Sequence, residues 1–506
     1  MSDEGRIAQS TASQTQVNSI GQRGWCWLVC LVCLVIIFSS LGSSALFEPD
    51  EGRNAEKARE ILLLGDWVTP HENFLPTLDK PVFFYWLVAS SFILFGLSEW
   101  SARLPSALAA LGCIFLVYRF AKLQWGWREA LWSPLVLVTS LEFFLFSRIV
   151  IFDMTLTFCV ALALFSLYAV TQTNNPKAKR YGLLMYAAMG VRTLVKGPIA
   201  VVIPGMVIFF YLLFTRKWFL LRRLRIALGA VVYFAIVAPW YLWVEARNPG
   251  YLRYFLWEEH FVRYLTPHFG RTKTWYYFLL VLGVGFLPWS LFIPFAVKKL
   301  WNRPLSDVNL FLGLWVILPF AFFSASSAKL PDYILPIYPA LALLIGQAVV
   351  PKIQDPETKR SWVPYIVGIF IVSFIVYLLV GAAWPNLLAS DIRPAIRESV
   401  FPLLLYGIMI CTVLGVFLAG DLKKVWQGQG PALTCTAAWF SFLFWLVGSS
   451  PALRFIGRQN QSRSERSLRW IVRSGWYFMT LISKGFRFIS GLTNRSGSYS
   501  RRTKAT

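Results

Sequence analysis

The acidic residues best suited to chemistry are two aspartates that stand at the ends of long apolar runs. Asp50 follows the first apolar run directly, and Asp153 lies in the turn between two later runs. One isolated carboxylate could activate an acceptor hydroxyl or amine by taking its proton, while the other orients a group or contacts a metal. The alternative for Asp50 is that it only caps the helix that the following residues predict. We take Asp50 and Asp153 as the candidate catalytic residues.

Cationic residues are expected on the same side of the apolar runs as these aspartates. They are Arg53, Lys80, Lys196 and Lys329. Arg53 could bind a phosphate as a bidentate fork, and the three lysines could bind it as point charges. For all of them except Lys80, the alternative is a solvated loop charge. Together they indicate a site for a lipid phosphate.

A histidine raises the question of a metal. His260 is one of three histidines in the chain and follows Glu258 and Glu259. With Asp79 it could hold a divalent cation, although a lone histidine often has only a structural role. The sequence leaves the metal open. It contains no glycine-rich loop of the P-loop or dinucleotide type, so no nucleotide cofactor is expected.

The composition is that of an integral membrane protein. Of the 506 residues, 57% are hydrophobic and only 15% are charged, which leaves too few polar residues to cover a water-soluble domain of this length. The formal net charge is +24, but the lysines and arginines form short clusters between the apolar runs. Such clusters are typical of the inner loops of membrane proteins, so no nucleic-acid partner is expected. The seven cysteines all lie in apolar runs and indicate neither disulfides nor a zinc site.

The apolar runs predict an all-α protein with thirteen transmembrane helices. With the N-terminus inside, every inner loop carries basic residues, as the positive-inside rule requires. The basic loops alternate correctly only if the apolar run Val82–Leu97 does not cross the membrane. We therefore expect this run to lie along the outer membrane interface, with Tyr85 and Trp86 at headgroup depth. Glu51–Leu64 predicts a second interfacial helix. The spans are expected near residues 25–46, 104–119, 130–148, 154–171, 181–195, 198–214, 226–244, 275–297, 308–325, 333–350, 362–384, 400–419 and 431–449.

These spans divide the chain into three parts. Residues 1–24 are expected to form a cytoplasmic N-terminus, and residues 25–450 the transmembrane domain, with 47–103 as its first outer loop. Residues 451–506 form a basic amphipathic tail that could lie on a membrane surface. The thirteen-span order puts this tail outside, against the positive-inside rule, and leaves its side open.

Short segments spread in order across residues 20–350 resemble the aminoarabinose transferase and protein O-mannosyltransferase family. These proteins are GT-C membrane glycosyltransferases that depend on a polyprenyl-phosphate sugar. The resemblance implies the GT-C fold, with interfacial helices in the first outer loop. The segments that carry it are Glu48–Arg53, Gly65–Pro70, Asp79–Pro81, Tyr85–Trp86, Ser98–Ser106, Asp153, Lys196–Pro198, Pro239–Tyr241, Glu259–Phe261 and Lys329–Pro336.

The resemblance also implies roles for single residues. Asp50 corresponds to the principal catalytic carboxylate and Asp153 to a second functional one. Arg53, Lys80 and Tyr333 match positions that contact the phosphate of the lipid carrier. The resemblance thus adds Tyr333 to the cations already chosen as donor-phosphate ligands.

For the metal, the resemblance implies a pair of ligands at Asp79 and His260. In the aminoarabinose branch the first of these ligands is glutamate. Because Asp79 has a shorter side chain, the resemblance does not decide whether a divalent cation binds here. The C-terminus also departs from the family, whose members commonly continue into a soluble outer domain.

These observations predict an inverting membrane glycosyltransferase that acts at the outer face of the bacterial plasma membrane. It would move one sugar from a polyprenyl phosphate to a lipid such as lipid A, or to a protein. Catalysis would need an activated acceptor and positive charge beside the departing phosphate. The alternative is a transporter or flippase for lipid-linked sugars, which would carry charges along a path through its spans rather than at one membrane face. A non-catalytic assembly subunit would not explain the residues from Asp50 to Lys80.

Overall fold

The computed structural model describes residues 24–39, 41–43, 45–46, 49–172, 176–262, 273–301 and 306–354, and these are almost entirely helical. A first helix, Gly24–Phe38, precedes the labelled elements. A two-residue antiparallel hairpin, β1 and β2, pairs His71 with Pro76 and Glu72 with Leu75. In chain order the elements are α2 (Asp50–Leu64), β1 (His71–Glu72), β2 (Leu75–Pro76), α3 (Phe83–Phe95), α4 (Glu99–Gln124), α5 (Trp127–Thr139), α6 (Leu141–Phe146), α7 (Phe152–Thr171), α8 (Ala178–Lys196), α9 (Ile199–Thr215), α10 (Leu220–Leu224), α11 (Ile226–Arg247), α12 (Tyr251–Arg253), η1 (Tyr254–Val262), α14 (Tyr277–Gly285), η2 (Trp289–Phe292), α15 (Ile293–Trp301), α16 (Asp307–Ala325), η3 (Pro331–Ile337) and α17 (Tyr338–Gln354).

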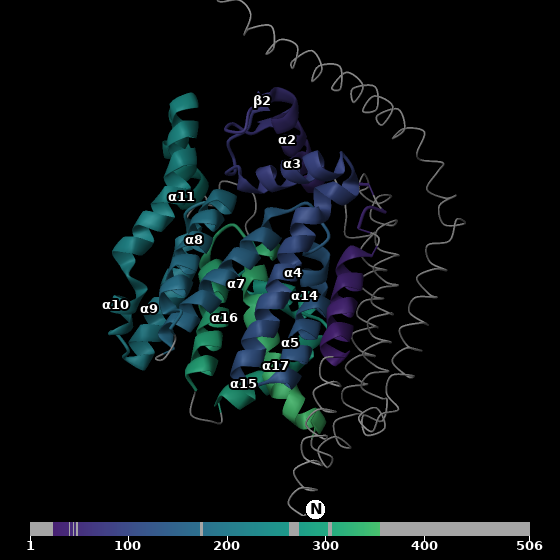
Figure 1. Ribbon diagram of the computed structural model, residues 1–506, viewed down its shortest axis with the longest axis vertical. Coiled ribbons are helices and arrows are strands. Elements are labelled where there is room, and N and C mark those ends of the chain that lie inside the picture. The colour runs from purple at the N-terminus through teal and green to yellow at the C-terminus, as the bar shows by residue number, and fades with distance from the viewer. Residues whose placement is uncertain are drawn as a thin grey trace, which may run out of the picture. The chain divides into compact units, whose positions relative to one another are not determined.

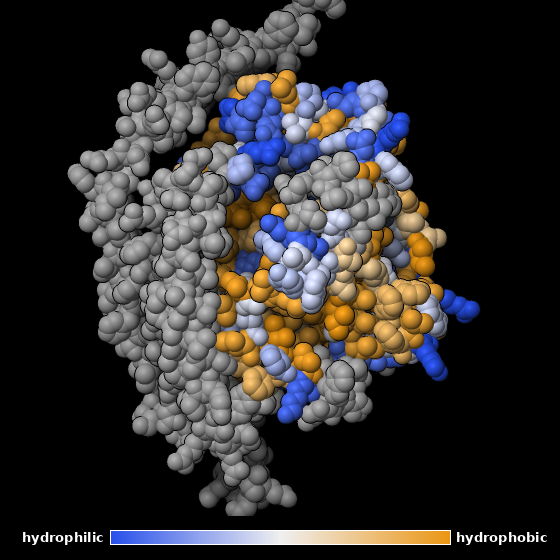
Figure 2. All heavy atoms as spheres, turned by 180° about the vertical axis from the view of Figure 1, so that it is seen from behind, coloured by the Kyte–Doolittle hydropathy of each residue, from blue (hydrophilic) through white to orange (hydrophobic). Residues whose placement is uncertain are grey.

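The long helices run side by side as a bundle, with α2, α3 and the hairpin at one end and α10 at the other (Figure 1). Helix α7 packs against α4 and α8, and α17 packs against α5. On the face shown in Figure 2, hydrophilic residues gather at the end that carries α2, and a broad apolar band lies below them. An apolar band between polar ends is the surface expected of a protein that crosses a bilayer.

The number of spans is not settled by the part of the chain that the structure describes. In that part, five helices are long and apolar enough to cross a membrane, or six if one bent pair forms a single span. Three shorter apolar helices are Gly24–Phe38, Phe83–Phe95 and Val201–Thr215. The spans predicted near 362–384, 400–419 and 431–449, and the tail at 451–506, lie outside the described residues. The total of thirteen stays a prediction.

Two of the predicted spans are interrupted rather than continuous. Residues 275–297 form α14 and a second helical piece that are bent by 108° against each other. Pro288 lies in this break, where its missing N–H and its ring disfavour a continuous helix. The predicted span 130–148 breaks at Ser140, between α5 and α6.

The two interruptions meet inside the bundle. The backbone N–H of Leu141 donates to the carbonyl of Leu287 (3.1 Å), and the indole of Trp289 donates to the hydroxyl of Thr139 (2.9 Å). A broken helix leaves backbone groups unpaired, and in a membrane these groups need partners from the protein. The bond between Leu141 and Leu287 therefore pairs one backbone group from each break, and the bond between Trp289 and Thr139 holds the two breaks together.

Both helices predicted in the first outer loop are present, as α2 and α3. Leu63, Leu64, Leu94 and Phe95 are exposed on them, which suits contact with the membrane interface. The headgroup depth expected for Tyr85 and Trp86 stays a prediction, but Tyr85 does not face the headgroups. Its side chain is only 1% exposed, because α3 turns the face that carries Tyr85 toward α2 and α4.

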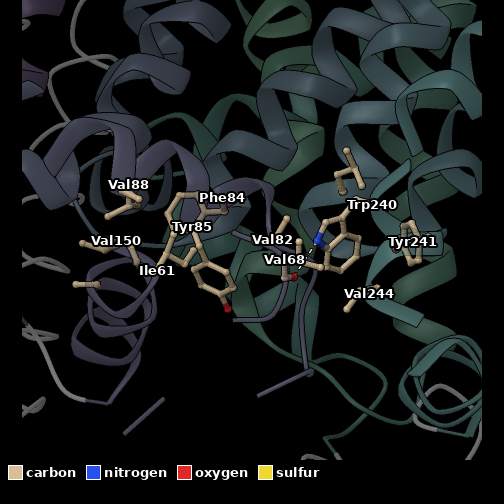
Figure 3. Close-up of a cluster of buried hydrophobic side chains, with 14 of the residues drawn as sticks. Ile61, Val68, Val82, Phe84, Tyr85, Val88, Val150, Trp240, Tyr241 and Val244 are labelled. Carbon is tan, nitrogen blue, oxygen red and sulfur yellow. Dashed lines mark hydrogen bonds between the residues drawn. The ribbon is translucent and has the colours of Figure 1, made fainter. Parts of the chain in front are cut away.

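A core of buried apolar side chains joins this loop to the bundle (Figure 3). It combines Ile61 of α2, Phe84 and Tyr85 of α3, Val150 before α7, and Trp240 of α11. The indole of Trp240 donates to the backbone carbonyl of Val68 at 3.0 Å, as the dashed line in Figure 3 shows. The loop that follows α2 is therefore fixed to α11, far along the chain.

A buried ion pair gives α2 its position. Arg103 of α4 donates to both carboxylate oxygens of Glu51, at 2.9 and 2.8 Å, and to the backbone carbonyls of Leu41 and Ala45. The backbone N–H of Val150 donates to Glu51 at 2.8 Å. The two charged side chains are only 3–4% exposed. One ion pair thus connects the chain after the first helix, α2, α4 and the turn before α7.

We predict that Glu51→Gln destabilises the protein by about 3–5 kcal/mol, because it leaves the charge of Arg103 buried without its counter-charge. Thermal unfolding of the purified protein in detergent would measure the loss. Glu56→Gln is the matched control, since Glu56 pairs only with Arg59 on a more exposed face of the same helix among the ion pairs of the described residues. Equal unfolding temperatures for the two variants would contradict the prediction.

Candidate active site

Four charged side chains come together where α2 faces the hairpin. Arg53 donates to both carboxylate oxygens of Glu72, at 2.9 and 3.2 Å. Lys57 donates to Asp79 at 2.8 Å and lies 3.4 Å from Glu72. Lys57 is 2% exposed, whereas Arg53 is 48% exposed. We call these four residues the loop charge cluster, and its two cations lie on one face of α2.

Helix geometry explains why these cations are neighbours. Asp50, Arg53 and Lys57 are separated by three and four residues, so they share a face of α2. Asp50 is the first residue of the helix and is exposed. Pro49 occupies the N-cap position, and no side chain caps the helix with a hydrogen bond. The alternative that Asp50 serves as a helix cap therefore lacks the hydrogen bond that a cap makes.

The charges of the cluster shift one another's protonation. The hydrogen bond to Glu72 is the main cause that raises the pKa of Arg53, and the nearby charges of Asp79 and Asp50 act in the same direction. For Asp79, burial raises the pKa, but Lys57 opposes this strongly enough that the net pKa lies below its usual value. Both side chains are therefore fully ionised at neutral pH.

Lys80 connects the cluster to η1. Its amino group donates to the backbone carbonyl of Asp79 at 2.8 Å and to the carboxylate of Glu259 at 3.4 Å. The hydroxyl of Tyr254 also donates to Glu259, at 3.3 Å. The sequence prediction that placed Arg53 and Lys80 in one phosphate site is thus consistent with two cations held at one end of the bundle.

The prediction of a divalent cation at Asp79 and His260 stays untested. His260 lies in η1, but its side chain is outside the described part of the structure. Among the described residues, no group of three or more His, Cys, Asp or Glu side chains could hold a metal ion. Asp79 already binds Lys57, so a metal there would compete with this lysine for the carboxylate.

Asp153 and Lys196 belong to a second group. The amino group of Lys196, at the end of α8, binds the carboxylate of Asp153 at the start of α7 and lies 3.1 Å from the carboxylate of Asp332 in η3. It also lies over the ring of Tyr333, 4.9 Å from its centroid. One oxygen of Asp153, Oδ2, is buried and has no hydrogen-bond partner among the described residues. We call these four residues the bundle charge cluster.

The described contacts of the Lys329 amino group are with backbone carbonyls and not with either cluster. This amino group donates to the backbone carbonyls of Ser326 (2.5 Å) and Lys273 (3.2 Å). These two described hydrogen bonds stabilise the turn before η3. The phosphate roles predicted for Lys196, Lys329 and Tyr333 stay predictions, and a phosphate would have to replace carboxylates beside Lys196.

Aromatic side chains lie between the two charge clusters. Lys57 lies over the ring of Tyr85, at 5.6 Å, and Lys196 lies 5.8 Å from the ring of Phe152. Phe84 contacts both rings edge-on, at 6.4 Å from Tyr85 and 5.6 Å from Phe152. The two clusters are therefore connected by packed aromatic rings, of which Phe84 and Tyr85 are fully buried.

Sequence reasoning missed Lys57 and Glu72, and gave Asp332 no role. Lys57 had a readable signal, because it follows Arg53 by four residues on a predicted helix. Glu72 had none, since the hairpin depends on tertiary packing. Asp332 lies in the Lys329–Pro336 segment that carries the family resemblance, but the close approach of η3 to α8 also depends on tertiary packing. Both were identified only from their distances to the predicted cations.

Comparisons with known proteins match this chain to glycosyltransferases that use lipid-phosphate sugars. A family model described as dolichyl-phosphate-mannose-protein mannosyltransferase matches residues 79–243. The undecaprenyl phosphate-alpha-4-amino-4-deoxy-L-arabinose arabinosyl transferase of Pseudomonas paraeruginosa is 32% identical over 403 residues, which cover 79% of this chain and 71% of that protein. The same enzyme of Aeromonas salmonicida is 31% identical over 360 residues, 70% of this chain and 65% of that protein.

A solved structure extends this similarity to three dimensions. The crystal structure of ArnT from Cupriavidus metallidurans bound to undecaprenyl phosphate superimposes with a TM-score of 0.71 at 33% identity. The match covers 85% of this chain and 78% of that one. The predicted all-α membrane fold of the GT-C type is thereby confirmed.

We predict that Lys57→Met loosens the hairpin, because Glu72 and Asp79 then repel each other without the cation between them. Hydrogen exchange of the backbone amides of residues 66–79 should become faster, while exchange in α4 stays unchanged. Lys217→Met is the control for the loss of a lysine, since its ion pair with Asp307 involves neither α2 nor the hairpin. Unchanged exchange in Lys57→Met would show that the cluster does not hold the loop.

Proposed function

Because the chain belongs to the undecaprenyl phosphate-aminoarabinose transferase family, we propose that its two charge clusters carry out sugar transfer from a lipid phosphate. The protein is a multi-pass membrane glycosyltransferase that uses a polyprenyl-phosphate sugar donor to modify a lipid acceptor of the lipid A type. Membership of this family favours transfer over the flippase that the sequence left as an alternative.

The observation that carries the assignment of residues is the position of three cations beside an exposed carboxylate. Arg53 and Lys57 lie on α2, Lys80 follows the hairpin, and Asp50 begins the same helix. A polyprenyl chain could remain in the apolar band of the bundle while its phosphate meets these cations. We propose Arg53 and Lys80 as the main ligands of the donor phosphate, with Lys57 positioning them through Glu72 and Asp79.

The proposed reaction is a single displacement. The acceptor hydroxyl attacks the anomeric carbon of the donor sugar, and its proton moves to the carboxylate of Asp50. The bond between the anomeric carbon and the phosphate oxygen breaks, and its electron pair leaves with the phosphate, where the cations stabilise the added charge. Attack from the face opposite the phosphate would invert the configuration at this carbon.

Asp153 has a different proposed role, because its surroundings differ from those of Asp50. It is 1% exposed and bound to Lys196, so it is poorly placed to take a proton from an incoming acceptor. We propose instead that Asp153 positions Lys196 through the ion pair between them. A metal at Asp79 and His260 would add positive charge near the phosphate; elemental analysis of the purified protein tests for it.

We further propose that this end of the bundle faces the outside of the bacterial plasma membrane. The support is the positive-inside rule, since the segment 216–225 at the opposite end carries five basic residues. A reporter active only outside the membrane should work when fused near Ser98 and fail when fused near Lys217. Activity of the reporter at both positions, or only near Lys217, would reject the orientation.

The experiment that tests the function uses a purified polyprenyl-phosphate sugar with a radiolabelled sugar and lipid A as acceptor. We expect label to move to lipid A with the wild-type protein. Asp50→Asn should reduce turnover at least about 100-fold, the low end for loss of a general base, because it keeps the side-chain shape but cannot accept the proton. Glu56→Gln on the same helix should retain activity. A well-folded Asp50→Asn protein with near wild-type turnover would overturn the assignment of Asp50 as the base.

The role of Lys80 predicts an effect on donor affinity. Lys80→Ala should raise the KM for the donor by on the order of 10- to 100-fold, since a charge-assisted hydrogen bond contributes about 1.5–3 kcal/mol. The KM for lipid A should change little. Arg59→Ala provides a control for the loss of one positive charge nearby. An unchanged donor KM in Lys80→Ala would remove this lysine from the phosphate site.

A further inference from the structure

A second cationic site lies at the end of the bundle opposite the charge clusters, around α10 (Figure 1). The segment 216–225 contains five basic residues and no acidic one. Lys217 at its start is paired with Asp307. The transfer reaction proposed above uses none of these residues.

Three basic side chains from this region line one small hollow between α8, α10 and α11. They are Lys179, Arg223 and Arg225, and no carboxylate is among the described residues that line it. Arg223 donates to the backbone carbonyl of Gln172 at 3.1 Å, which fixes its guanidinium near the hollow. Three cations around one concave surface, with no carboxylate among its described lining residues, give a positive local potential that favours an anion.

The backbone is shaped to make this hollow. Arg225 has φ of 48° and ψ of 53°, a left-handed conformation that few residues other than glycine adopt, and it bends the chain between α10 and α11. A Cβ atom at Gly229 would lie only 2.0 Å from the ring of Tyr186. The glycine therefore allows the tyrosine ring to lie against α11 and form one wall.

The surroundings of the hollow indicate what kind of anion it meets. Trp218, Phe219, Leu221 and Ile226 are exposed beside the cations, at the end of the apolar band. Aromatic and aliphatic side chains next to arginines are typical of the level of lipid headgroups. A soluble anion or a nucleic acid would gain nothing from these apolar groups, whereas a phospholipid would contact them with its acyl chains.

We propose that Lys179, Arg223 and Arg225 bind the phosphate of an anionic phospholipid in the leaflet at this end of the bundle. The arginines bind the phosphate oxygens through their planar N–H groups and the lysine adds a point charge. The acyl chains lie along the exposed apolar side chains of α10 and α11. The bound lipid connects α8 to α11, two helices that also contribute to the active-site end of the bundle.

The test is native mass spectrometry of the full-length protein in detergent, with dioleoyl phosphatidylglycerol, dioleoyl phosphatidylcholine and inorganic phosphate as separate probes. We expect phosphatidylglycerol to bind at least about tenfold more tightly than phosphatidylcholine. Arg223→Gln and Lys179→Gln should each weaken phosphatidylglycerol binding about five- to tenfold, as expected for a basic residue at a lipid headgroup. Arg222→Gln is the matched control, because Arg222 neighbours Arg223 in sequence but does not line the hollow.

Three results would overturn the proposal. Equal affinity for the two lipids would show that charge does not select the ligand. Equal weakening by Arg222→Gln and Arg223→Gln would show a diffuse surface attraction rather than a site. Binding of inorganic phosphate as tight as that of phosphatidylglycerol would assign the hollow to a free anion. Donor transfer activity of each variant, measured in the same preparation, confirms that it is folded, since the site does not touch the charge clusters.

Discussion

The buried ion pair between Glu51 and Arg103 is the interaction on which the active-site end of the molecule depends. It fixes α2 against α4 and, through the N–H of Val150, also fixes the turn that leads into α7. Asp50 precedes Glu51 by one residue, and Asp153 follows Val150 by three. Both candidate catalytic carboxylates are therefore positioned by the same pair of side chains, which explains why a loop between membrane helices can hold them in a defined relation.

The charges at this end balance one another when no substrate is present. Arg53, Lys57 and Lys80 are held by Glu72, Asp79 and Glu259, so the cations remain ordered without a phosphate. A donor phosphate would compete with these carboxylates, and part of its binding free energy would be spent in separating existing ion pairs. The advantage is that the cations are already oriented when the donor arrives, which lowers the entropy lost on binding.

Much of this arrangement could be predicted from the sequence, because apolar runs and their charged ends follow from the chemistry of the bilayer. Asp50, Arg53 and Lys80 were found because they lie close to the ends of apolar runs and match positions of the family that the sequence resembles. The partners Glu72 and Asp332 could not be found, since a two-residue hairpin and a 3₁₀ turn bring them to their cations through tertiary contacts. The burial of Tyr85 could not be predicted for a related reason: α3 is apolar all round, so its sequence does not tell which face is buried.

The hydrogen bond between Leu141 and Leu287 constrains how the lengths of two distant segments can change. Insertion of one residue before Leu141 would rotate α6 by about 100° and shift it along its axis, which would remove the amide from the Leu287 carbonyl. A matching change near Pro288 would be needed to restore it. Surface loops usually accept insertions, but these two interruptions, about halfway through their spans, must keep their lengths together. Relatives with insertions or deletions should therefore carry them outside these two breaks.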